Sequence, residues 1–292
     1  MSKIKHYIKL TKPSIMLLVI VTGAAGLVVD GKLLDKPIDF FLVLISLFLT
    51  GGSANALNQY LERDIDAKMT RTAKRRPLPS GEISPLSALI FSISIGVIGC
   101  VIFWLRFNPL SALLALGTIL FYALFYTLYL KPNTPQNIVI GGIAGAMAPI
   151  IACAAAAGAV SISALLMFAI IFFWTPPHFW ALALYLKDDY EKVDLPMMPK
   201  VKGEKHTITL MIIYTFIMVA CSLLLYRFDA GLVYFIAASV LGFTFIVKSI
   251  GLRKDSSRNA EMKLFRFSII YVLVLFMVII VEGIYFHAQF NT

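Results

Sequence analysis

Apolar segments long enough to cross a lipid bilayer recur from one end of the chain to the other. A helix of about 20 apolar residues spans a hydrocarbon core of about 30 Å. We therefore predict an all-α, polytopic membrane protein whose nine transmembrane helices form one domain over residues 1–292. The nine segments cover residues 14–30, 39–59, 84–105, 109–130, 138–157, 162–186, 207–226, 230–248 and 267–286.

The composition supports a membrane protein. Charged residues make up 14% of the chain and apolar residues 59%, whereas a soluble domain carries about 25% charged residues. The first apolar segment leads into the second without a small-residue cleavage site, so we expect no removable signal peptide. Three cysteines lie in three different segments without metal-binding or redox spacing, which predicts a packing role.

The distribution of Lys and Arg predicts the orientation of the helices, because these residues are retained on the cytoplasmic side. With the N-terminus inside, 22 of the 26 Lys and Arg residues fall on the inner side and 4 on the outer side. The net charge of +10 is explained by orientation and anionic headgroups, so we expect no nucleic-acid partner. We expect the lipid bilayer to surround the helices.

Two inner connections are long and carry both acids and bases, at residues 61–83 and 187–206. Because functional residues concentrate on such connections, we expect the active site near the inner face. A third inner connection, 249–266, is basic but lacks clustered acids, which indicates a role in topology. The fifth segment is built from small residues, with Gly141 and Gly145 in GxxxG spacing, and is predicted to be a closely packed central helix.

A polar stripe lies at the inner end of the second segment. Asn58, Glu62 and Asp66 are four residues apart and share one helical face, with Asn55 one turn earlier. Mg²⁺ takes such oxygen ligands and completes its shell with water and substrate phosphate. We predict a metal site at these residues, with Asn55 as a secondary candidate and Asp64 off the stripe.

A basic cluster follows this stripe. Arg71 and Arg75 are four residues apart and converge on one anion if the helical turn continues, and Lys74 and Arg76 add positive charge. Carboxylates followed by arginines suit a diphosphate carried by Mg²⁺. Lys131, in a short inner loop, is either a membrane anchor or a further phosphate contact.

The sixth segment ends in a second group of polar residues. Pro176 and Pro177 are predicted to kink or interrupt the helix, and His178 follows them between Trp174 and Trp180. Acidic and phenolic side chains come next, at the inner face. They are Asp188, Asp189 and Tyr190.

At these residues the sequence resembles the UbiA superfamily of intramembrane prenyltransferases. The N-x3-D-x3-D signature and the R-T and R-P-L turn after it are matched, with Glu62 in place of the first Asp. The second acidic motif of quinone-directed members is incomplete here. Apolar residues occupy its first positions as far as Leu184, and only the acids Asp188 and Asp189 remain. This departure, with "WTPPHFWALAL" and "TPQNIVIGGIAGA", makes the chain similar to the heme-directed branch.

The resemblance implies nine helices around a central cavity, Mg²⁺ as cofactor, and farnesyl diphosphate and heme B as substrates. It implies a metal held by Asn58, Glu62, Asp66 and Asp189, and a heme contacted by His178. That histidine is either an axial ligand or the group that orients a water, and both remain open. The remaining roles implied are diphosphate binding by Arg71, Lys74, Arg75 and Lys131, heme packing by Trp174 and Trp180, and secondary contacts by Asp188 and Tyr190.

Two other functions compete with heme farnesylation. One is prenyl transfer to an aromatic acid or quinone precursor, and the other is a transporter or heme-handling scaffold without chemistry. The absence of an evident inverted repeat and the clustering of acids at one face weigh against transport. The resemblance further implies a bacterial plasma membrane location and, as partners, a heme A synthase or terminal-oxidase assembly factors.

Overall fold

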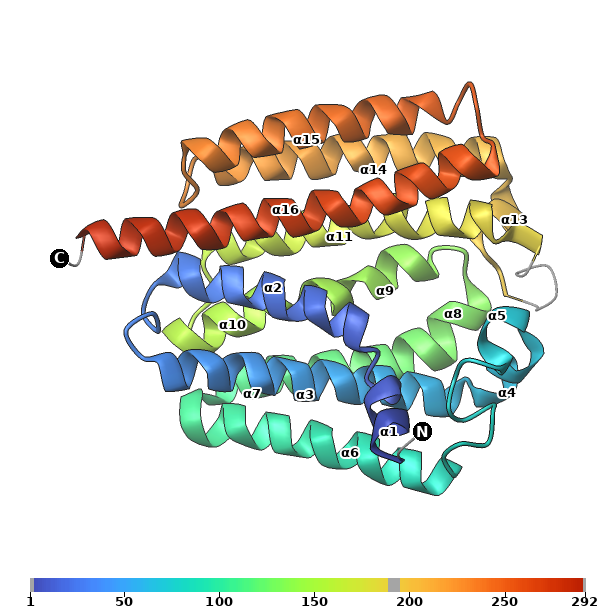
Figure 1. The fold of residues 1–292 in the computed structure, drawn as a ribbon, viewed down its shortest axis with the longest axis horizontal. Coiled ribbons are helices and arrows are strands. Elements are labelled where there is room, and N and C mark those ends of the chain that lie inside the picture. The colour runs from blue at the N-terminus through green and yellow to red at the C-terminus, as the bar shows by residue number, and fades with distance from the viewer. Residues whose placement is uncertain (1–2, 189–194, 291–292) are drawn as a thin grey trace.

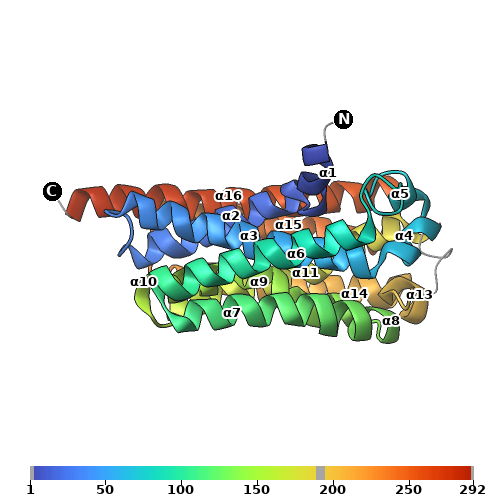
Figure 2. The ribbon, with the colours of Figure 1, turned by 90° about the horizontal axis from the view of Figure 1, so that it is seen from below.

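The computed structural model describes residues 3–188 and 195–290, and their regular structure is helical throughout. Nine helices or helix pairs of this described part are long and apolar enough to cross a membrane, as the sequence predicts. They run side by side along the long axis of the molecule, and the short helix α1 (Lys3–Leu10) projects from one side near α5 (Figures 1 and 2).

The N-terminal half contains the first four spans. Proline at the first turn starts each of them, where a missing N–H costs nothing. They are α2 (Pro13–Asp30), α3 (Pro37–Leu61), α6 (Pro85–Ile102) continued by the π-helix η1 (Phe103–Phe107), and α7 (Pro109–Leu120) continued by the π-helix η2 (Phe121–Leu130). Two short helices, α4 (Arg63–Lys68) and α5 (Thr70–Ala73), occupy the connection after α3, and α8 (Lys131–Asn133) follows η2.

The fifth span is divided into α9 (Asn137–Ala146) and α10 (Ala148–Ala157), with Pro149 at the start of the second half. It is the most buried of the nine spans in the described structure, which confirms the prediction of a central helix. Its small residues admit neighbouring side chains: a β-carbon at Gly141 would lie 2.3 Å from the Tyr126 ring. The GxxxG spacing therefore accommodates an aromatic ring at Gly141, while Gly145 has open space.

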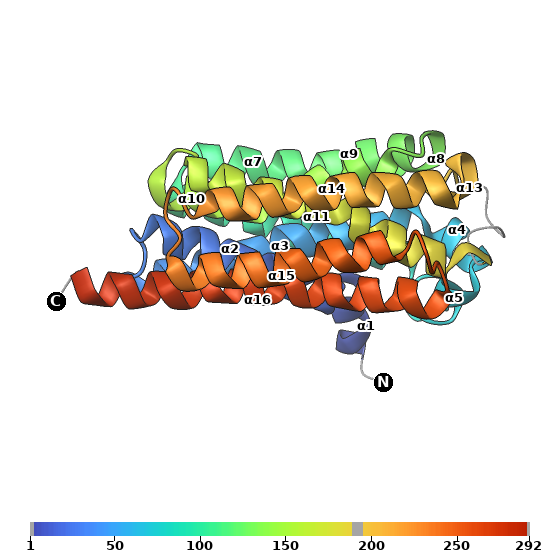
Figure 3. The same ribbon diagram turned by 90° about the horizontal axis from the view of Figure 1, so that it is seen from above.

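The last four spans are α11 (Ile162–Tyr185), α14 (Glu204–Leu225), α15 (Leu232–Gly251) and α16 (Arg258–Phe290), with the short α13 (Met198–Lys202) before α14. In Figure 3, α14, α15 and α16 lie along one another, and α11 packs against both α14 and α16. The largest cluster of buried apolar residues joins these helices to α9.

The helices correct two predictions in part. Of the predicted kink or interruption at Pro176 and Pro177, the interruption is wrong, because helix α11 continues through both residues; membrane helices tolerate proline where neighbouring groups bond the freed carbonyls. Helix α16 begins at Arg258, nine residues before the predicted apolar segment, because a helix with charged residues continues past the apolar region.

The connections predicted to face inward gather at one end of the bundle. Figure 1 shows α4, α5, α8 and α13 together there, and the C-terminus at the opposite end. The polar stripe of α3 and the acidic end of α11 therefore lie toward the same end of the molecule.

Candidate active site

The three oxygen-bearing side chains of the predicted stripe are brought together at the end of α3. Asn58 lies in the last turn of α3, Glu62 caps it, and Asp66 lies in α4. Although the helix is interrupted at Glu62, the backbone bonds of helical spacing continue, from Glu62 N to Asn58 O (3.0 Å) and from Asp66 N to Glu62 O (2.8 Å). The four-residue register is preserved, and each of the three side chains is only 2% exposed.

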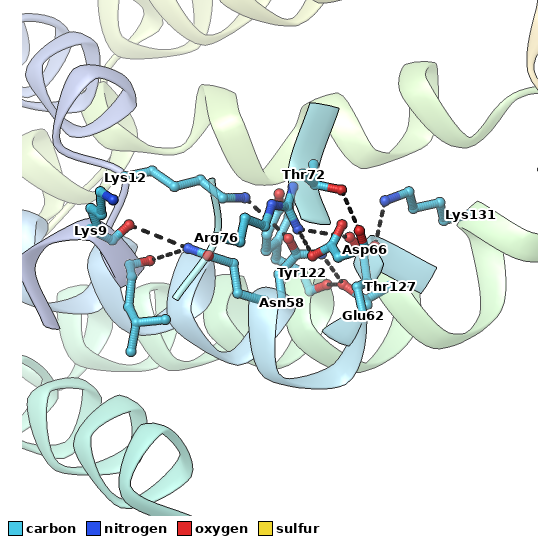
Figure 4. A network of polar contacts seen from close by, with 12 residues as sticks. Lys9, Lys12, Asn58, Glu62, Asp66, Thr72, Arg76, Tyr122, Thr127 and Lys131 are labelled. Atoms are coloured by element: carbon cyan, nitrogen blue, oxygen red, sulfur yellow. Dashed lines mark hydrogen bonds and ion pairs between the residues drawn. The ribbon is translucent and has the colours of Figure 1, made fainter. Parts of the chain in front are cut away.

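Each of these three side chains is paired with a cation from another part of the chain (Figure 4). Lys131 Nζ donates to Glu62 Oε1 at 2.5 Å, and Lys12 Nζ donates to Asn58 Oδ1 at 3.1 Å. Arg76 Nη1 forms an ion pair with Asp66 and lies 3.7 Å from Glu62 Oε2. The cations come from the start of α8, the α1–α2 junction and the turn after α5, so the site joins segments that are distant in sequence.

The π-helix η2 places two residues of the site. Thr127 donates its hydroxyl to the Tyr122 carbonyl, five residues earlier, at 2.8 Å, and accepts from Asn58 Nδ2 at 3.1 Å. Lys131 follows four residues after Thr127, directly after the π-helical segment. The wider turn of a π-helix is frequent at functional sites, and here it sets the register that brings Thr127 to Asn58 and Lys131 to Glu62.

Three basic side chains face two carboxylates in this cluster, which gives one net positive charge when Lys12 is protonated. Burial and the neighbouring Arg76 lower the pKa of Lys12 to about 7. Burial acts to raise the pKa of Glu62, but attraction from Lys131, Lys12 and Arg76 outweighs it and the net shift is downward. Burial raises the pKa of Asp66 despite the opposing effect of Arg76. A buried cluster with excess positive charge is suited to an anion.

The donor set fits Mg²⁺ that arrives with a phosphate. Two carboxylates and one amide oxygen are hard ligands, and Mg²⁺ in proteins takes one or two carboxylates and leaves other positions to water and phosphate. A basic side chain contacts an oxygen of each donor in this structure. Among the described residues there is no cluster of three or more His, Cys, Asp or Glu side chains.

The structure adds Arg76 to the polar cluster. Helix α5 ends at Ala73, and the predicted convergence of Arg71 and Arg75 on one anion stays a prediction. Lys74 and Arg75 are exposed, and neither forms an ion pair within the described residues. Arg76 returns to the site because its backbone N–H bonds the Thr72 carbonyl at 2.9 Å. The side chain of Arg71 lies outside the described part of the structure.

The remaining predicted site residues near α3 have other partners. Asn55 uses its amide as a donor to the Thr11 carbonyl, at 3.3 Å. Asp64 is exposed and lies 3.9 Å from Arg63, away from the stripe. Asp188 forms an exposed ion pair with Arg258. Asp189 and Tyr190 lie outside the described residues.

His178 is held in one orientation between α11 and α16. Its ring stacks between Trp174 and Phe265, at centroid distances of 4.2 and 4.6 Å. The Ser268 hydroxyl donates to the Phe265 carbonyl at 2.6 Å, so it accepts from His178 Nδ1 at 2.6 Å. In the neutral imidazole this assigns the proton to Nδ1 and leaves the Nε2 lone pair for a ligand or a proton.

Only one of the two tryptophans that flank His178 in sequence shares its face. Trp174 donates to the Ser268 carbonyl at 2.7 Å and covers His178. Trp180 is fully buried and meets the Tyr214 ring of α14 edge-on at 5.7 Å. Trp174 and His178 thus form one group against α16, and Trp180 belongs to the packing against α14.

A small apolar cavity of about 50 Å³ lies below the polar cluster on the same stripe of α3. Leu47, Thr50 and Gly51 line it from α3, opposite residues of α2, α7 and the α9–α10 junction. Gly51 precedes Asn58 by seven residues, which is about 10 Å along a helix.

Sequence comparison gives a family for this arrangement. Residues 18–280 match the model of the UbiA prenyltransferase family. The chain is 42% identical over 286 residues to a protoheme IX farnesyltransferase of Bartonella bacilliformis, covering 96% of this chain and 91% of the relative. It is 44% identical over 283 residues to a protoheme IX farnesyltransferase of Microcystis aeruginosa, covering 96% and 89%.

Comparison with solved structures gives the same fold. A structure reported for digeranylgeranylglyceryl phosphate synthase superposes with a TM-score of 0.80 at 21% identity, over 97% of this chain and 99% of that one. A UbiA homolog from Aeropyrum pernix K1 gives a TM-score of 0.71 at 18% identity, over 92% and 96%. A UbiA homolog from Archaeoglobus fulgidus bound to DMAPP and Mg²⁺ gives 0.63 at 18% identity, over 94% and 98%.

Proposed function

The chain belongs to the UbiA prenyltransferase family, and from this premise we propose that it transfers the farnesyl group of farnesyl diphosphate to a vinyl group of protoheme IX. The products are heme O and diphosphate. The observation that carries the transferase chemistry is the buried cluster in which three cations occupy three oxygen donors. The acceptor is proposed from the relatives, which are named for protoheme IX.

Transfer begins with departure of the diphosphate. The bond between farnesyl C1 and the diphosphate oxygen breaks, and both bonding electrons leave with the diphosphate. Arg76 and Lys131 are placed to donate to the oxygens on which negative charge develops, an electrostatic contribution that mutagenesis of comparable donors values at about 100-fold or more in rate. Mg²⁺, held by Asn58, Glu62 and Asp66, would neutralise and orient the diphosphate oxygens.

The farnesyl cation then reacts with the acceptor. The terminal carbon of a heme vinyl group bonds to farnesyl C1, and the positive charge moves to the vinyl carbon next to the porphyrin ring. Water adds to that carbon and loses a proton, which gives the hydroxyethylfarnesyl side chain. His178 is proposed to contact the heme, through Nε2 either to the iron or to the attacking water.

The two competing functions have less support. A quinone-directed transferase is disfavoured because the relatives that match 96% of this chain at 42–44% identity are named for protoheme IX. A transporter is disfavoured by membership of a prenyltransferase family. We propose further that this multi-pass membrane protein resides in a bacterial plasma membrane, with its site near the cytoplasmic face, and supplies a heme A synthase or terminal-oxidase assembly factors.

The test is to supply membranes containing the protein with heme B and farnesyl diphosphate, and to extract the pigment for mass spectrometry. The proposal predicts a heme that has gained a farnesyl group and one hydroxyl group. Membranes that consume farnesyl diphosphate with a quinone precursor, but leave heme unchanged, would assign the chain to the quinone-directed alternative. A control with Asp66→Asn should form little adduct.

A further inference from the structure

The junction between α1 and α2 has a backbone conformation that is unusual for its residue. Lys12 has φ 53° and ψ 68°, and it is the only residue other than glycine with positive φ in the described chain. In this left-handed region the β-carbon crowds the next carbonyl oxygen. Lys12 also precedes Pro13, which restricts it further. Such strain persists only where surrounding contacts impose it, and it is concentrated at functional sites.

Two amide side chains of α3 impose this conformation. Gln59 Nε2 donates to the Leu10 carbonyl at 2.8 Å and to the Lys9 carbonyl at 3.4 Å. Asn55 Nδ2 donates to the Thr11 carbonyl at 3.3 Å. Both amides are buried, so they clamp three successive carbonyls immediately before Lys12.

The consequence of the clamp is that a lysine at the membrane entry points into the site rather than toward water. Its ammonium lies 3.1 Å from Asn58 Oδ1, in the cluster that contains Glu62 and Asp66 (Figure 4). A lysine that only anchored the first span would be expected to extend to the headgroups; Lys5 and Lys9 of α1 are exposed, whereas Lys12 contacts the buried Asn58. The strained turn therefore delivers a third cation to a place where Arg76 and Lys131 already lie.

We propose that Lys12 is a diphosphate-binding residue, and that Asn55 and Gln59 are positioning residues that act through it. When a prenyl diphosphate enters, the ammonium moves from Asn58 Oδ1 to a diphosphate oxygen, and Asn58 Oδ1 becomes available to a metal. This inference rests on the proposed function for the identity of the prenyl substrate, but it requires only that the site takes a diphosphate. Asn55 is thereby assigned to the turn instead of to the metal.

The experiment measures binding of inorganic pyrophosphate with Mg²⁺ to the purified full-length protein, in the absence of heme. The variants are Lys12→Met, Lys12→Gln and Lys12→Arg. The matched control is Lys5→Met, which removes the same charge from an exposed position on α1. A hydrogen bond to a charged group corresponds to about a 10- to 100-fold change in affinity. We expect that loss in Lys12→Met and Lys12→Gln, a smaller loss in Lys12→Arg, and wild-type affinity in Lys5→Met.

The positioning role is tested by a double-mutant cycle with Asn55→Ala. If Asn55 acts through Lys12, Asn55→Ala weakens pyrophosphate binding in the wild type and has no further effect in Lys12→Met. Equal losses in both backgrounds would overturn the positioning role. Thermal denaturation identifies any variant that fails to fold. If Lys12→Met fails to fold, the pyrophosphate affinity of Lys12→Gln, which retains a donor for Asn58, tests the role of Lys12 instead.

Wild-type affinity in Lys12→Met or Lys12→Gln overturns the proposal. Its failure is distinguishable from failure of the proposed function, because the measurement omits heme. A protein that binds pyrophosphate through Lys12 but never modifies heme keeps this inference and loses heme as the acceptor. If the protein farnesylates heme but Lys12→Met binds pyrophosphate as tightly as the wild type, the proposed function stands and this inference is lost.

Discussion

Arg75 and Arg76 are adjacent in sequence, but the structure predicts opposite consequences for their replacement. Arg76 forms an ion pair with Asp66 and lies 3.7 Å from Glu62, and its side chain is 19% exposed. Arg75 is exposed and forms no ion pair among the described residues. We predict that Arg76→Gln lowers turnover of farnesyl diphosphate strongly, whereas Arg75→Gln has little effect. The two variants have the same net charge and the same position relative to the membrane.

The magnitude follows from the contacts that Arg76 makes. Loss of one donor to a developing oxyanion costs about 100- to 1000-fold in rate, and we expect the lower value because Lys131 and Lys12 remain. Removing one partner of a buried ion pair also destabilises a protein, by up to about 3–5 kcal/mol. Here the cost is smaller because burial already raises the pKa of Asp66, so that the carboxylate can take up a proton once Arg76 is absent.

The assay is pyrophosphate release under single-turnover conditions by purified protein, with thermal denaturation measured in parallel. We expect Arg76→Gln to be about 100-fold slower at a temperature where it is folded, and Arg75→Gln to be within about threefold of wild type. Equal loss in both variants, or a larger loss in Arg75→Gln, would refute this account of the site. It would mean that substrate recruits the exposed arginine and displaces the buried one.

Four further predictions follow from other contacts. Lys131→Met should slow pyrophosphate release about 100-fold because Glu62 loses its partner and the diphosphate loses a donor, and retention of full activity would indicate that Lys131 only anchors the helix. His178→Ala should abolish formation of the heme adduct while leaving pyrophosphate affinity within about twofold, and normal heme O synthesis would contradict a heme role. Gly141→Ala should lower the melting temperature through about 1–3 kcal/mol of overpacking against Tyr126, whereas Gly117→Ala, which meets nothing within 4 Å, should not. Glu282→Gln should cost about 1–2 kcal/mol because the carboxylate accepts from three backbone N–H groups at the start of α15, and an unchanged melting temperature would exclude that cap.

The sequence predicted the helices well because the bilayer constrains their length and hydropathy directly. Eight of the predicted segments begin and end within about three residues of the observed helices. The ninth failed at its start, because the first turns of α16 carry charged residues that no hydropathy window includes. The π-helical register of η2 has no sequence signal, since its apolar and aromatic residues suit an α-helix equally well.

The candidate site was predictable only where its residues lie on one helix. Asn58, Glu62 and Asp66 were predicted from their four-residue spacing. The structure preserves that register across the end of α3. Arg76 was predicted only to add positive charge, because the sequence does not show that it pairs with Asp66. Lys12 was counted only as an inner-side charge, since its contact with Asn58 joins residues 46 positions apart. Long-range pairing and strained turns depend on tertiary contacts, which spacing does not encode.

The central claim is that this site farnesylates heme, and the most direct measurement uses purified wild-type and Asp66→Asn proteins with heme B, farnesyl diphosphate and Mg²⁺. The extracted heme is analysed by mass spectrometry, and released pyrophosphate is quantified in the same samples. The account predicts a heme that has gained one farnesyl group and one hydroxyl group, with equal amounts of pyrophosphate, and about 100-fold less of both from Asp66→Asn. Unmodified heme from the wild type, or equal adduct from both proteins, would contradict it.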